Sequence, residues 1–207
     1  MTPTRILIFA KAPQPGVAKT RLIPVLGGEG AAALARRMLA NTLHAALAAR
    51  IGPVELCVSP SIDDESWRGI AVPTEVETSD QGSGDLGARM ARASARALAK
   101  SPSVLLIGTD CVEMHADLLC EAALALRAQS TVIYATADGG YALLGLSKYS
   151  PLLFSEMAWS TKTVAKETIL RIEKLGWSLH VGRLLHDVDE AADLVLLPKE
   201  WVFNATI

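Results

Sequence analysis

A basic loop near the start of the chain holds the residues best suited to bind phosphate. It follows the apolar run 6–9 and carries Lys11, Lys19 and Arg21, with no acidic residue before Glu29. Lysine and arginine side chains can offset phosphate charge together with backbone N–H groups. The loop therefore predicts a nucleotide site at the carboxyl end of a first strand, although a solvated basic turn has the same composition.

Two glycine-dependent phosphate motifs do not explain this chain. A Walker loop needs glycines where Pro13 and Ala18 stand, so that motif is absent. Residues 82–87, Gly-Ser-Gly-Asp-Leu-Gly, fit the dinucleotide pattern, but the preceding segment 74–80 is too polar for a buried central strand. A dinucleotide site there is disfavoured.

Three aspartates offer the oxygen ligands that Mg²⁺ or Mn²⁺ prefers. Asp110 follows the apolar run 104–107, where the carboxyl end of a central strand would face a ligand crevice. Strand-like backbone would put the Asp187 and Asp189 side chains on the same side. A metal held there could bridge phosphate oxygens. The alternative roles are helix caps, at Asp110 for the next helix and at Asp189 for a closing helix.

Three further segments could line the same crevice. Asp138-Gly139-Gly140-Tyr141 would let a ligand approach the backbone closely, and a tight hairpin needs the same residues. Trp159 and Ser160 could stack a ring or bind an anion, or could simply pack and cap a helix. Gln81-Gly82 and the segment 85–90, Asp-Leu-Gly-Ala-Arg-Met, could hold a base or sugar at the entry to a helix, or form only a surface turn.

Composition excludes several classes of protein. The 207 residues are half hydrophobic and carry a net charge of −2, which favours neither nucleic acid nor an anionic membrane as partner. No apolar run approaches the roughly 18 residues of a membrane span, and no signal peptide opens the chain, so we expect a cytoplasmic protein. Cys57, Cys111 and Cys120 lack metal-site spacing and are predicted to be buried free thiols.

Strands and helices are expected to alternate along the chain. This order predicts an α/β protein, a three-layer α/β/α sandwich with a mostly parallel sheet, in one domain spanning 1–207. The turn at 138–140 predicts one antiparallel strand. Ser160 or Thr161 is expected to cap the helix that follows. The predicted strands are 6–9, 54–59, 74–77, 104–107, 131–136, 141–146 and 179–181, and the predicted helices are 30–50, 85–100, 115–127, 162–175 and 189–197.

Six motifs in this order resemble the bacterial glycosyltransferase-A-like family known as DUF2064, in the nucleotide-diphospho-sugar transferase superfamily. They span nearly the whole chain. Two departures occur: Cys111-Val112 stands where the family has a small residue and Pro, and Ala135 replaces a Pro. The motifs are Lys11-Ala-Pro-x-Pro-Gly16-x-x-Lys19-Thr-Arg-Leu22, Gln81-Gly82 with Asp85-Leu-Gly-x-Arg-Met90, Gly108-Thr-Asp110, Asp138-Gly-Gly-Tyr141, Trp159-Ser-Thr161 and Asp187-Val-Asp189.

The resemblance implies a nucleotide crevice across the strand ends. It implies that Asp110 lies at Mg²⁺ or Mn²⁺ with Asp187 or Asp189, and that the 138–141 turn lies on the sugar or acceptor side. We predict Lys19, Arg21 and Asp110 as catalytic groups. The predicted nucleotide-binding residues are Lys11, Pro13, Gly16, Lys19, Thr20, Arg21, Gln81 and Gly82, and the predicted substrate-binding residues are Asp138, Gly139, Gly140, Tyr141, Trp159 and Ser160.

Three functions are compatible with these residues. The first is a metal-dependent glycosyltransferase that uses a nucleotide-diphospho-sugar and a small-molecule acceptor. The second is a nucleotidylyltransferase that joins an NTP to a small phosphorylated acceptor, which the number of basic groups in the first loop favours. The third is a non-catalytic nucleotide-binding protein, for which the absence of an obvious general base is the motive.

Overall fold

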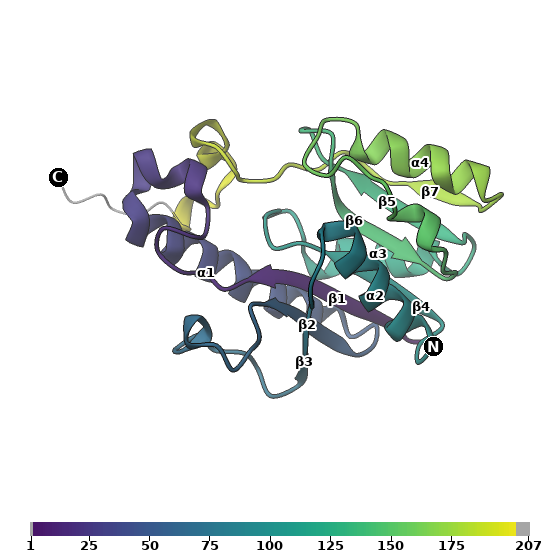
Figure 1. The fold of residues 1–207 in the computed structure, drawn as a ribbon, viewed down its shortest axis with the longest axis horizontal. Helices are drawn as coiled ribbons and strands as arrows, with labels where there is room; N and C mark the ends of the chain where they lie inside the picture. The colour runs from purple at the N-terminus through teal and green to yellow at the C-terminus, as the bar shows by residue number, and fades with distance from the viewer. Residues whose placement is uncertain (1, 202–207) are drawn as a thin grey trace.

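A computed structural model describes residues 2–201, and seven strands of this range form one sheet (Figure 1). The strand order is β3-β2-β1-β4-β6-β5-β7. Every predicted strand is present, and three have the predicted bounds because turn residues flank their apolar runs. The strands are β1 (Thr4–Lys11), β2 (Val54–Ser59), β3 (Val76–Asp80), β4 (Ser103–Ile107), β5 (Thr131–Ala135), β6 (Tyr141–Leu146) and β7 (Leu179–Val181).

The sheet is parallel except at β6, which pairs antiparallel with both β4 and β5. The remaining ladders, including β1 with β2 and β4, are parallel. A tight turn between β5 and β6 reverses the chain, and Gly139 has φ 93° there, a conformation that favours glycine. The mostly parallel sheet with one antiparallel strand is therefore confirmed.

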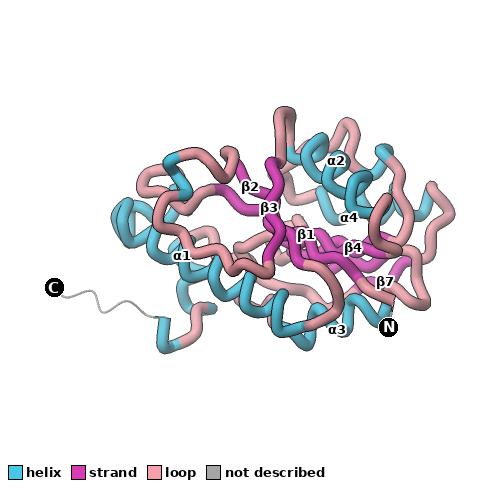
Figure 2. The backbone as a smooth tube through the Cα atoms, turned by 90° about the horizontal axis from the view of Figure 1, so that it is seen from below, coloured by secondary structure: helices cyan, strands magenta, loops and turns pink. Residues whose placement is uncertain are grey.

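Helices cover both faces of the sheet, as Figure 2 shows. The first and third helices pack on one face and the second and fourth on the other. The α-helices are α1 (Ile23–Ala49), α2 (Leu86–Leu98), α3 (Ala116–Ala125) and α4 (Val164–Lys174). Short 3₁₀ helices are η1 (Thr20–Leu22), η2 (Glu65–Trp67), η3 (Pro151–Leu153), η4 (Ala191–Leu196) and η5 (Lys199–Trp201). The predicted three-layer sandwich is confirmed.

The helix boundaries differ from the prediction, by one or two residues at α2, α3, α4 and the closing helix and by more at the start of α1. α1 begins at Ile23 rather than at residue 30, because Ile23 and Leu26 pack against a buried cluster; Gly27, at φ 69°, breaks the helix internally. α4 has Thr163 as N-cap, so the expected caps Ser160 and Thr161 were wrong. The closing helix is the shorter 3₁₀ helix η4.

Apolar alternation along β1 divides the core between the two faces. Ile6 and Ile8 belong to the cluster under α1 and α3, and Leu7 belongs to the cluster under α2 and α4; all three are fully buried. A third cluster joins the start of α1 to the C-terminal segment, through residues that include Leu22, Leu34, Met38, Val188, Leu197 and Trp201.

The C-terminal segment 182–201 crosses the molecule from β7 to α1 (Figure 1, yellow-green to yellow). Leu185 N donates to Ala135 O at 2.9 Å near one end, and Trp201 packs in the third cluster at the other. The segment therefore passes the carboxyl ends of the central strands, where it delivers Asp187 and Asp189. Among the described helices, none combines the length and apolarity needed to cross a membrane.

Candidate nucleotide and metal site

A crevice of about 780 Å³ opens at the carboxyl ends of the central strands. It brings together residues from the first loop, the end of β4, the β5–β6 turn, the loop before α4 and the C-terminal segment. Most predicted site residues line it: Lys11, Lys19, Thr20, Arg21, Gln81, Asp110, Asp138, Gly140, Tyr141, Trp159, Ser160, Asp187 and Asp189. Pro13, Gly16, Gly82 and Gly139 are not among its lining residues.

Lys19 lies at the centre of the acidic group. Its Nζ is 2.5 Å from Asp110 Oδ1 and 3.0 Å from Asp189 Oδ1, and it donates to Val188 O at 2.6 Å. The side chain is 6% exposed, whereas the two aspartates are about half exposed. Burial lowers the pKa of Lys19, but the two carboxylates outweigh burial and hold that pKa above its ordinary value.

Asp187 is the carboxylate without a counter-charge. Burial and the negative charges of Asp110, Asp189 and Asp138 raise the pKa of Asp187 to about 7, and Lys19 opposes the rise. Within residues 2–201, Asp187 makes no ion pair of its own. This end of the crevice therefore holds more negative charge than its one ammonium offsets.

The C-terminal segment is fastened beside Asp110 by its backbone. Cys111 forms an antiparallel bridge with Asp187, and Val188 N donates to Asp110 O at 2.8 Å. Val188 is fully buried, so the backbone that carries Asp187 and Asp189 on either side of it is held in place. Val112, one of the departures from the family pattern, packs against the third core cluster.

The alternative capping roles of the aspartates were wrong. His115 is the N-cap of α3, where its Nδ1 accepts from Leu118 N at 3.3 Å, so Asp110 is not needed there. Glu190 is the N-cap of η4, and Asp193 accepts from the Asp189 and Glu190 amides. The carboxylates of Asp110 and Asp189 face Lys19 instead.

The chemistry of this donor set fits a hard divalent cation. Asp110, Asp187 and Asp189 supply carboxylate oxygens, and burial together with the neighbouring carboxylates raises the pKa of Asp187. In the arrangement described for residues 2–201, no three acidic, histidine or cysteine side chains are placed to hold an ion. The Lys19 ammonium lies between two of the predicted ligands.

The Asp138 turn serves both as a hairpin and as a crevice wall. Asp138 Oδ1 accepts from Thr136 Oγ1 at 2.5 Å and from Gly140 N at 2.9 Å, which fixes the turn. A Cβ on Gly139 would meet Lys162 O at 2.1 Å, so the turn packs directly against the segment before α4. Gly139 thus acts by close packing rather than by lining the crevice.

The Gln81 side chain is hydrogen-bonded to the backbone of the sheet. Its Nε2 donates to Ala10 O at 3.1 Å and to Cys57 O at 2.8 Å, and its Oε1 accepts from Arg89 at 3.4 Å. These bonds tie β1 and β2 together below the crevice. Gln81 is therefore placed as a buried support, with its Nε2 already bonded to the protein.

The loop before α4 is held by packing of Trp159. Its Nε1 is shielded from solvent and lacks a hydrogen-bond partner among the described residues. A Cβ on Gly87 would come within 2.6 Å of that nitrogen, so the indole lies directly on the start of α2. Ser160 follows with a left-handed backbone, φ 62°. Trp159 both packs and lines the crevice.

Sequence reasoning missed the apolar wall of the crevice and one rim contact. Phe9, Val17, Leu86 and Met90 line it, and Val17 and Leu86 are 63% and 44% exposed. The exposure of large apolar side chains beside polar loops is the signal that could have marked Val17 and Leu86, but it is visible only in the fold. At the rim, Arg21 lies 3.6 Å from Glu190.

The structure also places the histidine beside the acidic pair and the three cysteines. His186, next to the acidic pair, has Nδ1 3.1 Å from Glu113 Oε2, so it faces away from the carboxylate group and toward a partner at the surface. All three cysteines are free, but Cys120 is exposed, so the expectation of a buried thiol was wrong there.

Comparison with known proteins agrees with this geometry. The family model of DUF2064, "uncharacterized protein conserved in bacteria", matches residues 42–161. The structure of a candidate nucleotide-diphospho-sugar transferase from Desulfovibrio desulfuricans G20 has a TM-score of 0.88 and 28% identity, covering 99% of this chain and 90% of that one. No curated protein matches the sequence.

More distant structures share the fold alone. Rv0371c from Mycobacterium tuberculosis H37Rv, in complex with manganese, has a TM-score of 0.53 and 16% identity over 95% of this chain and 98% of that one. A cytidylyltransferase from Leptospira borgpetersenii serovar Hardjo-bovis (strain JB197) has a TM-score of 0.56 and 14% identity over 94% and 85%. The family match covers more than half of the residues, and the chain therefore belongs to the DUF2064 family, with the nucleotide-diphospho-sugar transferase fold.

Proposed function

We propose that this protein is a metal-dependent transferase that uses a nucleotide-diphospho-sugar and transfers the sugar to a small-molecule acceptor. The observation that carries the proposal is the meeting of Lys11, Lys19 and Arg21 with Asp110 and Asp187 in one crevice. Basic groups and a metal-binding carboxylate set are the two requirements for holding a diphosphate. The Desulfovibrio relative supports the transferase class.

Different residues of the crevice would bind the diphosphate and the cation. Lys11 and Arg21, from the first loop, would attract the diphosphate and fix its position. Asp110, with Asp187 or Asp189, would hold Mg²⁺ or Mn²⁺; when bound, the cation would supply positive charge to the departing diphosphate. The manganese complex of Rv0371c supports a divalent cation in this fold.

A further part of the crevice wall would receive the sugar and the acceptor. The Asp138 turn, Tyr141 and Trp159 line the crevice, and Leu86 and Met90 add apolar surface to it. Such a wall would exclude water from the reacting carbon and favour transfer to the acceptor over hydrolysis.

Nucleotidylyl transfer is the second candidate. The first loop concentrates three basic residues, which suits the larger charge of a triphosphate, and the Leptospira neighbour is a cytidylyltransferase. The two functions differ in the by-product. Glycosyl transfer releases a nucleoside diphosphate, and nucleotidylyl transfer releases pyrophosphate.

A thermal-shift panel of NTPs, NDPs and NDP-sugars, each with and without Mg²⁺ or Mn²⁺, tests the proposal. A ligand at about a hundred times its Kd adds roughly 2.7 kcal/mol. For a protein of this length, that is about 5–10 °C in Tm. We expect one NDP-sugar to give the largest metal-dependent shift.

Product analysis then separates the candidates. Release of a nucleoside diphosphate in the presence of an acceptor pool would support glycosyl transfer, and release of pyrophosphate from an NTP would support the second function. Asp63→Asn, an exposed aspartate distant in sequence from the site, is the control for Asp110→Asn. A flat panel across all nucleotides would refute both functions.

A further inference from the structure

Lys19 occupies the oxygen-rich position between two of the predicted metal ligands. A lysine ammonium has three N–H donors, and Lys19 Nζ lies within reach of three oxygens: Asp110 Oδ1 at 2.5 Å, Asp189 Oδ1 at 3.0 Å and Val188 O at 2.6 Å. The Lys19 side chain is only 6% exposed, and the three protein oxygens take the place of water as hydrogen-bond partners of its ammonium. The carboxylates are thus bound by a cation that belongs to the chain.

A divalent cation and the Lys19 ammonium would compete for these carboxylates. Positive charges held a few ångströms apart repel, and each is stabilised by the same Asp110 and Asp189 side chains. Asp187 makes no ion pair among the described residues, so its carboxylate would be available to an ion with a higher charge. Binding of a metal at the carboxylates would therefore favour the release of Lys19.

The backbone of Lys19 is in the uncommon left-handed region. Its φ and ψ are 50° and 44°, although the residue has a Cβ, and no side-chain cap accompanies it at the start of η1. This conformation is strained for a residue with a Cβ, and the three contacts of Nζ can offset the strain. Lys19 also lines the crevice with Lys11 and Arg21, so a released side chain would join those basic groups.

We propose that Lys19 is an exchange residue, whose ammonium holds the cation position in the metal-free protein and moves to the nucleotide phosphates when Mg²⁺ or Mn²⁺ binds. The inference rests on the proposed metal-assisted use of a nucleotide. It makes metal binding and phosphate capture cooperative, because the same displacement clears the carboxylates and adds a positive charge to the phosphate side.

Lysine acetylation of the wild-type protein tests the exchange directly. Sulfo-NHS-acetate is added with EDTA, with Mg²⁺ alone, and with Mg²⁺ plus a nucleoside diphosphate, and the rate at each lysine is followed by peptide mass spectrometry. We expect Lys19 to react slowly with EDTA, about tenfold faster with Mg²⁺ alone, and slowly again when the nucleotide is added. Lys11, exposed on the same crevice, is the internal reference and should not respond to Mg²⁺ alone.

A pair of variants tests the same proposal from the metal side. Without nucleotide, Lys19→Met should bind Mn²⁺ about tenfold more tightly than wild type, as expected when a competitor that closes the site about nine-tenths of the time is removed. Lys148→Met, at an exposed lysine that does not line the crevice, should leave Mn²⁺ affinity unchanged. Both affinities are measured from the free Mn²⁺ signal by electron paramagnetic resonance.

Several outcomes would overturn the exchange. One is a Lys19 acetylation rate that is the same with EDTA and with saturating Mg²⁺. Another is a Lys19→Met variant whose affinity for Mn²⁺ is no higher than that of wild type. Failure of the wild-type protein to bind Mg²⁺ or Mn²⁺ at millimolar concentration would also overturn it. These readouts use the metal alone, so exchange can hold even where no sugar or nucleotidyl transfer is found, which separates the two proposals.

Discussion

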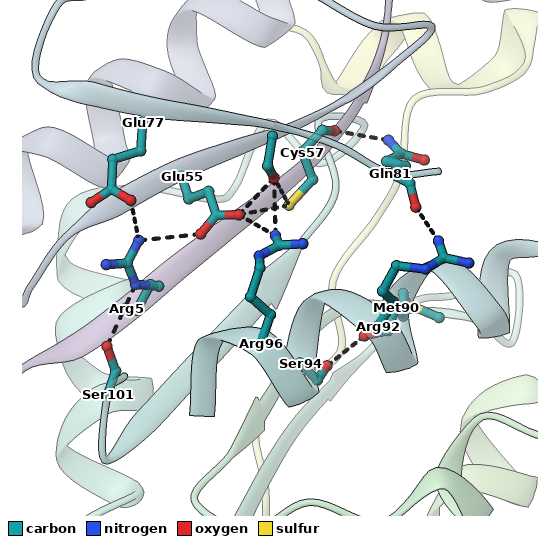
Figure 3. A network of polar contacts seen from close by, with 11 residues as sticks. Arg5, Glu55, Cys57, Glu77, Gln81, Met90, Arg92, Ser94, Arg96 and Ser101 are labelled. Atoms are coloured by element: carbon teal, nitrogen blue, oxygen red, sulfur yellow. Dashed lines mark hydrogen bonds and ion pairs between the residues drawn. The ribbon is translucent and has the colours of Figure 1, made fainter. Parts of the chain in front are cut away.

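The sheet carries charged clusters at both of its ends, and they are built in opposite ways. At the amino ends of the strands, the amino-end cluster consists of Arg5, Glu55, Glu77 and Arg96 (Figure 3), with Ser79 hydrogen-bonded to Glu55 and Arg96. At the carboxyl ends, the crevice cluster consists of Lys19 with Asp110, Asp138, Asp187 and Asp189. In the amino-end cluster every carboxylate forms an ion pair with an arginine of the same cluster, whereas in the crevice cluster some carboxylates form no ion pair within the described part of the chain.

Every carboxylate of the amino-end cluster has an arginine. Glu55, 5% exposed, pairs with Arg5 at 3.2 Å and with Arg96, and it accepts from Ser79 Oγ at 2.6 Å. Glu77 pairs with the same Arg5 guanidinium at 2.8 Å. A cavity of about 220 Å³ borders the cluster, but its charges are already satisfied.

In the crevice cluster, the Lys19 ammonium pairs with Asp110 and Asp189, whereas Asp138 and Asp187 make no ion pair among the described residues. Buried charges that balance stabilise a fold, or at least do not disrupt it, whereas surplus charge at a crevice lowers stability until a ligand binds. The amino-end cluster is therefore structural, and the crevice cluster is the cation site that we propose.

Removing a carboxylate from the amino-end cluster should have the largest effect. Glu55→Ala leaves Arg5, which is 8% exposed, and Arg96 without their central partner, so the free energy of unfolding should fall by about 3 kcal/mol. Urea unfolding measures the loss. Glu65→Ala, in an exposed pair with Arg68, is the control and should change little. Nucleotide affinity of folded Glu55→Ala should match wild type; a loss of affinity would break the distinction between the clusters.

Removing a carboxylate from the crevice cluster should affect function instead. Asp110→Asn should lower kcat by about a hundredfold to a thousandfold, about 2.7–4 kcal/mol in activation free energy, because the charge-stabilising cation loses a ligand. The metal-dependent part of the nucleotide thermal shift should disappear while urea stability is retained. Full metal-dependent binding by this variant would show that Asp110 is not a ligand.

Asp187→Asn should stabilise the metal-free protein. Burial and the three neighbouring carboxylates disfavour the charged form of Asp187, so removing the charge should raise the free energy of unfolding by about 1 kcal/mol at pH 8 in EDTA. The pKa of Asp187 is raised to about 7, above its unfolded value, so the gain should shrink as pH falls from 8 toward 4. A destabilised variant at pH 8 would mean that the cluster is balanced after all.

Glu77→Gln should have the smallest effect, because Glu77 is 58% exposed although it belongs to the amino-end cluster. The loss should stay below about 1 kcal/mol at pH 7. A hydrogen bond from Arg5 lowers the pKa of Glu77, so its contribution is present above its unfolded pKa and disappears as pH falls through the lower folded value. Urea midpoints at several pH values measure this, and an effect as large as that of Glu55→Ala would mean that exposure does not weaken the pair.

The strands and helices could be predicted from the sequence more accurately than the contacts between side chains. β2, β6 and β7 have the predicted bounds because each is a short apolar run flanked by turn residues. The start of α1 was missed because three glycines at 27, 28 and 30 hide a helix that tertiary packing of Ile23 and Leu26 supports.

The site residues were predicted by type, but not their pairing. Lys19 and Asp189 are 170 positions apart in sequence, so no local pattern could place the ammonium between the carboxylates. Glu55 inside the apolar strand Val54–Ser59 was a signal of a buried pair, but its arginine partners come from β1 and α2 and are visible only in the fold.

The most direct test of the central claim is anomalous diffraction from crystals grown with Mn²⁺ and a nucleoside diphosphate. We predict one strong manganese peak coordinated by Asp110 and at least one of Asp187 and Asp189, with Lys19 Nζ moved onto the phosphates. Nucleotide bound in the crevice without manganese at these aspartates, or manganese bound at Glu55 and Glu77 instead, would contradict the assignment of the crevice cluster as the cation site.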